Sequence, residues 1–353
     1  MGMPSVTIGF TEVAKTVIQR GNRGTIAMIV RDTVPDTNPI IYLPGDALPN
    51  VLSAANRKQV ELASIGYVNK PKKIISYVIA NESEDYKEAF NGLDTEKFDY
   101  LVCPSVETDE QTKEVADWTI QKNQEGETFI AILPNHEANS ECIINFTNEA
   151  IMTGEKTYST EEYCSRIAGI LAGAPLTMSC TYAELPEVKN CDRYTRREMD
   201  AFVDAGHLFM FFDGEKVKLA RAVNSLTKET AEKGNKFRKI KIVDTINMIK
   251  NDIRRTAEDN YLGKYANTYD NKCLLISAIS NYLTQLVKDG ILDNQLVEID
   301  IEANKAYLAG IGVKIAEMTD EEIKVADTGS NVFVKAVINI PDAIEDITIQ
   351  FTI

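Results

Sequence analysis

The feature that most constrains the fold is an alternation of apolar and polar residues near both ends of the chain. Val6, Ile8 and Phe10 fall on one face of an extended segment over 5–10. Residues i, i+2 and i+4 of a strand share a face, so this pattern predicts an amphipathic strand. The same alternation returns at the other end, with Ile347, Ile349, Phe351 and Ile353 on one face. Each strand leaves a row of backbone groups that needs a sheet edge to pair with.

Two short segments lie between these strands and the body of the chain. Residues 11–24 include a glycine-containing run, Arg20 to Gly24, and Pro341 to Asp346 precede the second strand. A terminal strand on such a lead can add to the sheet edge of another copy. That contact is head-to-tail, so it propagates into rings or helical filaments. Pairing inside its own domain is the alternative for either strand.

The length of the chain predicts several domains between these ends. Its 353 residues exceed the size at which one hydrophobic core usually stops growing. The expected parts are an N-terminal arm over 1–23, a small β-rich domain over 24–91, an α/β domain over 92–230, an α+β domain over 231–340 and a C-terminal arm over 341–353. The expected fold class is therefore α/β and α+β multidomain.

A β-α-β pattern marks the start of the middle domain. Phe98 to Val102 and Phe129 to Leu133 predict strands, and 115–122 predicts a helix after a capping box at Thr108-x-x-Gln111. Strands joined in this way usually pair in parallel. The unit indicates a parallel sheet.

Three later segments complete the middle domain. A second capping box, Ser159-x-x-Glu162, begins a helix, and the glycines between Ala168 and Ala174 favour a closely packed helix end. The turn Asp213-Gly214 separates two short strands. These segments fit an α/β domain.

The C-terminal domain combines strands and helices. Lys239 to Val243 predicts a strand with Asp244 as the cap of a following helix, and a second helix is expected from about Asn271 to Lys288. The alternating residues Val332, Val334, Ile338 and Ile340 predict a further strand. We expect a sheet here with open edges.

Composition and charge exclude several classes of protein. Lys and Arg total 38 against 53 Asp and Glu, a net charge of −15, which argues against a surface that binds nucleic acid or anionic lipid as a whole. No apolar run reaches the roughly 18 to 20 residues of a membrane span, and the start lacks the features of a signal peptide. We expect a protein that stays in the cytoplasm and no membrane insertion.

The chain is poor in catalytic groups. It has two histidines, six cysteines without a C-x-x-C pair, and no phosphate-binding or nucleophile motif, so we expect no enzyme activity, cofactor or metal. The alternative is an α/β hydrolase or small-molecule-binding enzyme. Its pocket would lie near Cys103-Pro104-Ser105 and Pro134-Asn135-His136, at the carboxyl ends of middle-domain strands.

One basic segment stands out in this acidic protein. Lys233 to Arg255 holds eight basic and two acidic residues, a charge of +6, so the rest of the chain carries −21. A solvated face paired with local acids is one interpretation. A docking surface for an acidic protein is the other.

Three separated blocks resemble contractile phage tail sheath proteins. The first runs from Arg166 to Leu176 and continues over 179–188, the second is Arg221 to Thr227, and the third runs from Lys239 to Tyr265. The length is most similar to short sheaths of phages and phage-tail-like bacteriocins (tailocins) of Gram-positive bacteria, including the diffocin type. Residues 1–90 match least distinctly.

The resemblance implies a structural role. Such sheaths are six-fold helical homopolymers around an inner tail tube, bounded by baseplate and tail terminator proteins, and they contract to drive the tube through a target envelope. No nucleotide is hydrolysed. The middle domain of many sheaths is subtilisin-like in fold, and the missing Ser-His-Asp arrangement implies a non-catalytic one. The family's particles are released from the cell.

The resemblance also suggests roles for individual residues, because family arms complete a sheet in a neighbouring C-terminal domain. The strands at the two ends would be exchanged through their apolar residues, and Val332, Val334, Ile338 and Ile340 would belong to the acceptor sheet. In the basic segment, the tube-facing candidates are Lys236, Arg238, Arg254 and Arg255.

Overall fold

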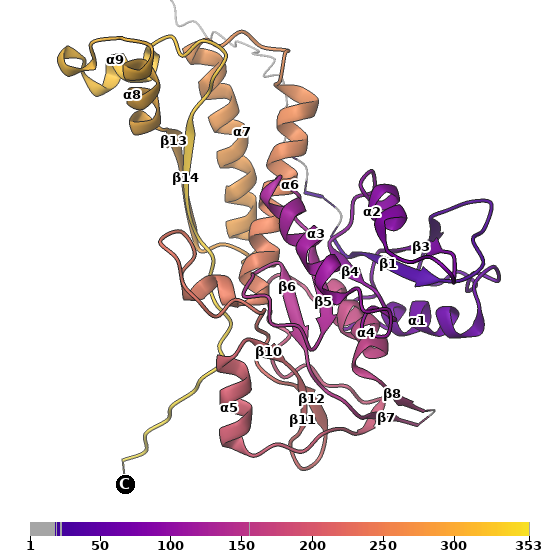
Figure 1. The fold of residues 1–353 in the computed structure, drawn as a ribbon. Coiled ribbons are helices and arrows are strands. Elements are labelled where there is room, and N and C mark those ends of the chain that lie inside the picture. The colour runs from indigo at the N-terminus through magenta and orange to yellow at the C-terminus, as the bar shows by residue number, and fades with distance from the viewer. Residues whose placement is uncertain (1–17, 19, 22, 155, 353) are drawn as a thin grey trace, which may run out of the picture. The chain divides into compact units, whose positions relative to one another are not determined.

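The computed structural model describes residues 18, 20, 21, 23–154 and 156–352, which form two compact units. The larger unit comprises residues 21–251 and the segment after Asn339. The smaller unit contains residues 252–339 together with Ile18 and Arg20. Figure 1 labels the helices and strands of both units.

A seven-stranded sheet forms the centre of the larger unit, in the order β10-β6-β5-β4-β1-β3-β2. Neighbouring strands are parallel except β2, which runs antiparallel to β3. The strands are β1 (Thr25–Arg31), β2 (Ile40–Tyr42), β3 (Lys73–Ile79), β4 (Tyr100–Val102), β5 (Ile130–Pro134), β6 (Ile143–Phe146) and β10 (His207–Leu208).

Helices cover both faces of this sheet. Buried side chains of α1 (Ala54–Ser64) and α4 (Thr160–Gly173) pack on one face, and those of α2 (Lys87–Leu93) and α3 (Thr112–Gln124) pack on the other. Since both faces are covered, the strands are apolar runs rather than alternating ones. The predicted β-α-β unit is confirmed as β4, α3 and β5, with β4 and β5 parallel.

Two glycines allow α4 to approach the backbone beside α1. A Cβ atom on Gly169 would lie 2.2 Å from the carbonyl oxygen of Ala63, and one on Gly173 would lie 2.1 Å from that of Asn69. Only glycine fits such contacts without displacing the backbone. The predicted close-packed helix end is therefore confirmed, and the predicted capping box at Ser159 is present.

The remaining elements of the larger unit are short. Strands β7 (Ile151–Thr153), β8 (Thr157–Tyr158) and β9 (Val188–Asn190) form a small sheet, and β11 (Met210–Phe212) pairs with β12 (Val217–Leu219). The β11–β12 hairpin confirms the predicted turn, where Gly214 has a φ of 111°. Helix α5 (Arg196–Asp204) and the 3₁₀ helix η1 (Asn235–Arg238) complete this unit.

The smaller unit is α+β, as expected. It contains the later turns of α6 (Ile240–Asn260), then α7 (Tyr269–Lys288), α8 (Ile301–Gly310), η2 (Ile315–Glu317) and α9 (Asp320–Val325). Strand β13 (Asn294–Ile299) runs antiparallel to β14 (Val334–Asn339). The helix expected over 271–288 is confirmed, with Gly290 at a φ of 71° after its end.

Three local predictions are wrong. The separate β-rich domain over 24–91 is not found, because β1 and β3 pair in the same sheet as β4. The predicted strand Lys239 to Val243 is instead the start of α6, whose first turn is buried on several sides. The capping box predicted at Thr108 is not formed: α3 begins after Gln111, which makes no side-chain cap hydrogen bond, and the Thr108 hydroxyl donates to Glu161.

Candidate subunit interface

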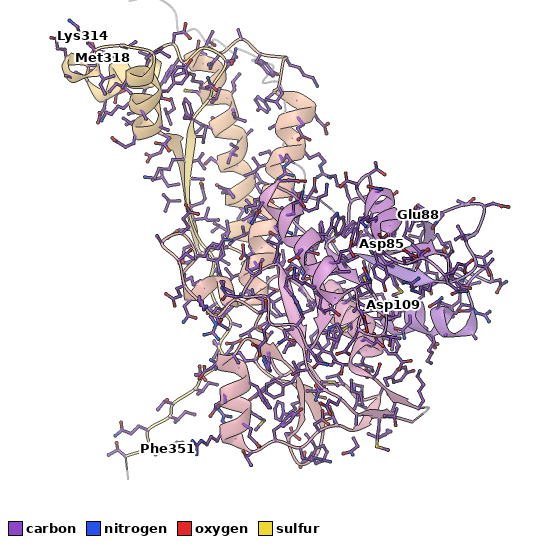
Figure 2. All side chains as sticks on the ribbon, viewed as in Figure 1. Asp85, Glu88, Asp109, Lys314, Met318 and Phe351 are labelled. Atoms are coloured by element: carbon purple, nitrogen blue, oxygen red, sulfur yellow. The ribbon has the colours of Figure 1, made fainter. Side chains whose placement is uncertain are left out.

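The C-terminal arm carries a row of exposed apolar side chains. The exposed fractions of Ile347, Ile349 and Phe351 are 74%, 68% and 84%. The segment 341–352 has no assigned helix or strand, and Figure 2 shows Phe351 on the chain that leaves the larger unit. Large apolar side chains gathered at the surface mark interaction sites. The alternation that predicts a strand therefore lies on a segment without a sheet partner in its own described chain.

A sheet with open edges is present in the smaller unit. Strands β13 and β14 pair only with each other among the described residues. Val337 lies opposite Leu296, and both are at least half exposed, at 50% and 55%. A two-stranded sheet is marginal alone, so this one can accept further strands.

The predicted acceptor residues have different positions. Val334 and Ile338 lie in β14 opposite Ile299 and Gln295 and are half-buried. Val332 precedes the strand, and Ile340 follows it as a buried residue. The N-terminal interface candidates Val6, Ile8 and Phe10, together with Ile353, lie outside the described residues.

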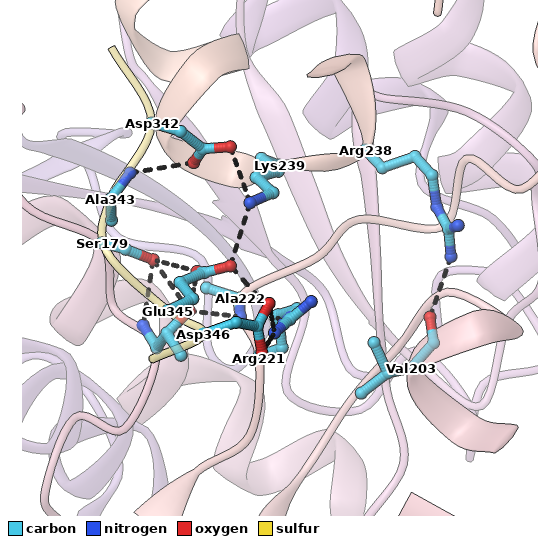
Figure 3. A network of polar contacts seen from close by, with 11 residues as sticks. Ser179, Val203, Arg221, Ala222, Arg238, Lys239, Asp342, Ala343, Glu345 and Asp346 are labelled. Carbon is cyan, nitrogen blue, oxygen red and sulfur yellow. Dashed lines mark hydrogen bonds and ion pairs between the residues drawn. The ribbon is translucent and has the colours of Figure 1, made fainter. Parts of the chain in front are cut away.

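The segment that leads to the C-terminal arm is fastened to the larger unit. The Glu345 side chain, only 5% exposed, accepts hydrogen bonds from the Thr181 hydroxyl at 2.6 Å and from Lys239 Nζ at 3.0 Å. Lys239 also contacts the carboxylate of Asp342 at 2.7 Å. Figure 3 shows the Asp342 and Glu345 carboxylates both joined to Lys239 by dashed lines.

Two further contacts extend this attachment. Arg221 Nη2 donates to both carboxylate oxygens of Asp346 at 2.7 Å. Lys241 Nζ donates to the backbone carbonyl of Pro341 at 2.7 Å. We call the whole set the lead clamp: the segment Pro341 to Asp346 held by Thr181, Arg221, Lys239 and Lys241.

The electrostatics of the lead clamp favour its ion pairs. Burial opposes the charge on Lys239, but hydrogen bonds to Asp342 and Glu345 outweigh it and leave the pKa of Lys239 raised. The hydrogen bond from Arg221 lowers the pKa of Asp346. Both shifts keep the partners charged near neutral pH.

The lead clamp changes the interpretation of the basic segment. Lys239 and Lys241 bind the acidic lead of the same chain, so part of this segment is a face paired with local acids. Arg238 donates to the carbonyl oxygens of Val203 and Asp204 at the end of α5. The other three tube-facing candidates are exposed or half-buried, and each makes an interaction of its own: Lys236, Arg254 and Arg255.

A second buried network fixes the chain where it enters the larger unit. Arg23 Nη2 contacts the Asp244 carboxylate at 2.5 Å and also donates to the Tyr100 hydroxyl. The Tyr100 hydroxyl donates to Asp244 at 2.7 Å. Burial raises the pKa of Asp244 to about 6, although Arg23 opposes this shift. Both ends of the larger unit are therefore held near the first turn of α6: Lys241 binds the start of the C-terminal segment, and Asp244 binds Arg23 at the other end.

The enzyme alternative gains no support from the structure. A cavity of about 450 Å³ lies at the carboxyl ends of β5 and β6, lined by Asn135 and by His207 of β10 but not by His136 or Cys103. Burial lowers the pKa of His136 and raises that of the Cys103 thiol. Among the described residues, no group of His, Cys, Asp and Glu is arranged to hold a metal ion.

No helix in the described part of the chain is long and apolar enough to span a membrane.

Sequence reasoning missed the lead clamp. The acidic lead and the basic segment are both visible in the sequence, but their pairing joins residues that are 100 and 106 positions apart. Thr181 carried no signal of its own. The pattern Asp342-x-x-Glu345-Asp346, opposite in charge to the basic segment, was the signal that could have suggested the contact.

Comparison with solved structures identifies the fold. The chain superposes with a TM-score of 0.68 on the sheath tail protein of Desulfitobacterium hafniense, at 17% identity over 84% of this chain and 94% of the other. It superposes with a TM-score of 0.71 on the helical sheath of the anti-feeding prophage in its contracted state, at 14% identity over 100% of this chain and 99% of the other.

Sequence comparison identifies the family. Residues 80–225 match the central domain of phage tail sheath proteins, and residues 232–353 match the phage tail sheath C-terminal domain. The tail sheath protein of Clostridium phage phiCD119 is 38% identical over 99% of both chains. With both domains matched and a relative of this similarity over the full length, the chain belongs to the phage tail sheath protein family.

Proposed function

We propose that this protein is the subunit of a contractile tail sheath and that its copies are linked by exchange of their terminal strands. The observation that carries this proposal is the exposed alternation of Ile347, Ile349 and Phe351 on a segment without a sheet partner. The open β13–β14 sheet is the acceptor, and the N-terminal strand around Ile8 is the second exchanged element. A β-strand added to an edge gains main-chain hydrogen bonds, and alternate side chains supply specificity.

The energy of each contact is modest. Burying one such apolar side chain contributes roughly 1.5–3 kcal/mol, and ordering the arm offsets part of that gain. A polymer multiplies these contacts along its length. Because the exchanged strand begins at a fixed point on its own subunit, neighbouring subunits can rotate during contraction while the strand keeps its hydrogen bonds.

The assembly has the partners that the sheath family has. We infer a six-fold helical homopolymer around an inner tail tube, attached to baseplate and terminator proteins, assembled in the bacterial cytoplasm and released with the particle. The middle domain serves as a subtilisin-like but non-catalytic scaffold. The helical sheath whose structure this chain resembles supports a homopolymer.

The tube-facing candidates are Arg254 and Arg255 in α6 and Lys236 and Arg238 in η1. Exposed ion pairs are worth only about 0–1 kcal/mol each, which suits a partner that must be released. Arg254→Glu with Arg255→Glu is expected to reduce loading of the sheath onto tubes in a co-sedimentation assay. Loading equal to that of the unchanged protein would refute this placement.

Electron microscopy of the purified protein tests the strand exchange. The full-length chain is compared with a variant that lacks residues 1–10 and 347–353, at equal concentration and with tubes present in a parallel sample. We expect striated cylinders from the full-length chain and monomers from the shortened one. Cylinders from both would contradict the proposal.

A further inference from the structure

The lead clamp separates the C-terminal segment into two parts with different surroundings. Glu345 is almost fully buried, and its carboxylate is in contact with the Thr181 and Ser179 hydroxyls, Lys239 and Arg221. Ile344 in the lead is 87% exposed, and the alternating row of exposed apolar residues begins two positions after Glu345, with Ile347. The change from a buried, paired side chain to an exposed apolar one takes place within three residues.

The clamp is built to receive this lead. The Thr181 hydroxyl accepts a hydrogen bond from the backbone N–H of Ala222, which leaves its proton for Glu345. Arg221 Nη2 donates to both carboxylate oxygens of Asp346. Glu345 is the one deeply buried carboxylate of the clamp, whereas the Asp346 side chain is 80% exposed. Loss of its partners would be costly for Glu345, because its charge would stay buried.

We propose that the clamp keeps the lead Pro341 to Asp346 on its own subunit in the assembled sheath, so that only the segment from Ile347 onward passes to a second copy. This inference rests on the proposed strand exchange and specifies which residues take part in it. The clamp then fixes the point from which the arm starts.

A fixed starting point limits which neighbour the arm can reach. The seven residues 347–353 span at most about 23–25 Å when extended, whereas the thirteen residues 341–353 would span about 43–47 Å. The shorter reach restricts the arm to one acceptor edge. The clamp therefore selects the neighbour and keeps the lattice regular.

A carbodiimide cross-linking experiment tests where the lead lies. The reagent joins carboxylates to amines in direct contact, so it should couple Glu345 or Asp342 to Lys239. Cylinders are assembled from an equal mixture of light and isotopically heavy subunits. We expect cross-linked peptides from within single chains only. Mixed light–heavy pairs approaching half of the total would show that the lead travels with the arm, and would overturn the inference.

A variant without the lead carboxylates tests what the clamp does. It combines Asp342→Asn, Glu345→Gln and Asp346→Asn, which retain size but remove the ion pairs. We expect this lead variant to form irregular polymers in place of uniform cylinders, since its arms reach further. Uniform cylinders would overturn the inference.

A matched control makes the same change in charge elsewhere. It combines Glu82→Gln, Glu84→Gln and Glu88→Gln, three exposed residues for which the described part of the chain contains no ion pair. Glu88 is labelled in Figure 2. This control should form uniform cylinders. Irregular cylinders from the control would show that the change in net charge, and not the loss of the clamp, causes the irregularity. If the variant that lacks 347–353 still forms cylinders, the strand exchange itself fails, a result distinct from the failure of the clamp.

Discussion

Replacement of Ile347, Ile349 and Phe351 together by asparagine is expected to abolish assembly while the subunit stays folded. These side chains are largely exposed in the described chain, so the fold does not depend on them. Burying three such side chains in an acceptor sheet contributes up to roughly 5–9 kcal/mol per contact. Their loss should weaken each contact by about a thousandfold or more. Sedimentation velocity and electron microscopy measure the loss of polymer.

The other face of the same segment supplies the control for this prediction. Thr348→Asn, Gln350→Asn and Thr352→Asn alter the alternate positions, which a strand directs away from the apolar face. This variant should assemble as the unchanged chain does. Equal behaviour of the two variants, whether both assemble or both fail, would contradict a strand whose binding depends on one face.

The substitution Gly169→Ala is expected to destabilise the larger unit strongly. Its Cβ atom would lie 2.2 Å from the carbonyl oxygen of Ala63, a backbone atom that no rotamer change can move. Overpacking of a core commonly costs about 1–3 kcal/mol, and a clash with backbone should reach the upper end, roughly 3 kcal/mol or more. Chemical denaturation followed by circular dichroism measures the loss in free energy of unfolding.

Gly154 provides a matched glycine for comparison. A Cβ atom there would meet no atom within 4 Å. Gly154→Ala should therefore leave the denaturation midpoint almost unchanged. A midpoint for Gly169→Ala equal to that of Gly154→Ala would show that α4 can move away from α1 at little cost, contrary to the tight packing described here.

Several local signals in the sequence were reliable, although the capping box predicted at Thr108 was not. The capping box at Ser159, the turn at Asp213-Gly214 and the stop at Gly290 depend on neighbouring residues, and the structure confirms all three. Apolar runs also identified β4 and β5, and a helical pattern identified α3, because these signals lie within short stretches of the sequence. The apolar alternation of the C-terminal arm belongs to the same class of signal.

Tertiary structure decided what depends on distant partners. The prolines between Gly24 and Asn91 suggested a separate domain, yet β1 lies in the middle of the central sheet, because strand pairing is set by contacts far along the chain. The alternation from Lys239 to Val243 fits a strand of five residues, but the burial of Ile240 and Val243 within a long helix overrides it.

The lead clamp also combines features that are local in the sequence with contacts that only the tertiary structure creates. Sequence alone determined that the lead is acidic, that the segment before α6 is basic and that the arm has one apolar face. It could not determine that Lys239 and Lys241 bind this lead, since several acidic segments of the chain carry suitable charges. Only the fold brings Thr181, Arg221 and Lys239 together around Glu345, because coulombic attraction between exposed groups is weak until packing fixes their positions.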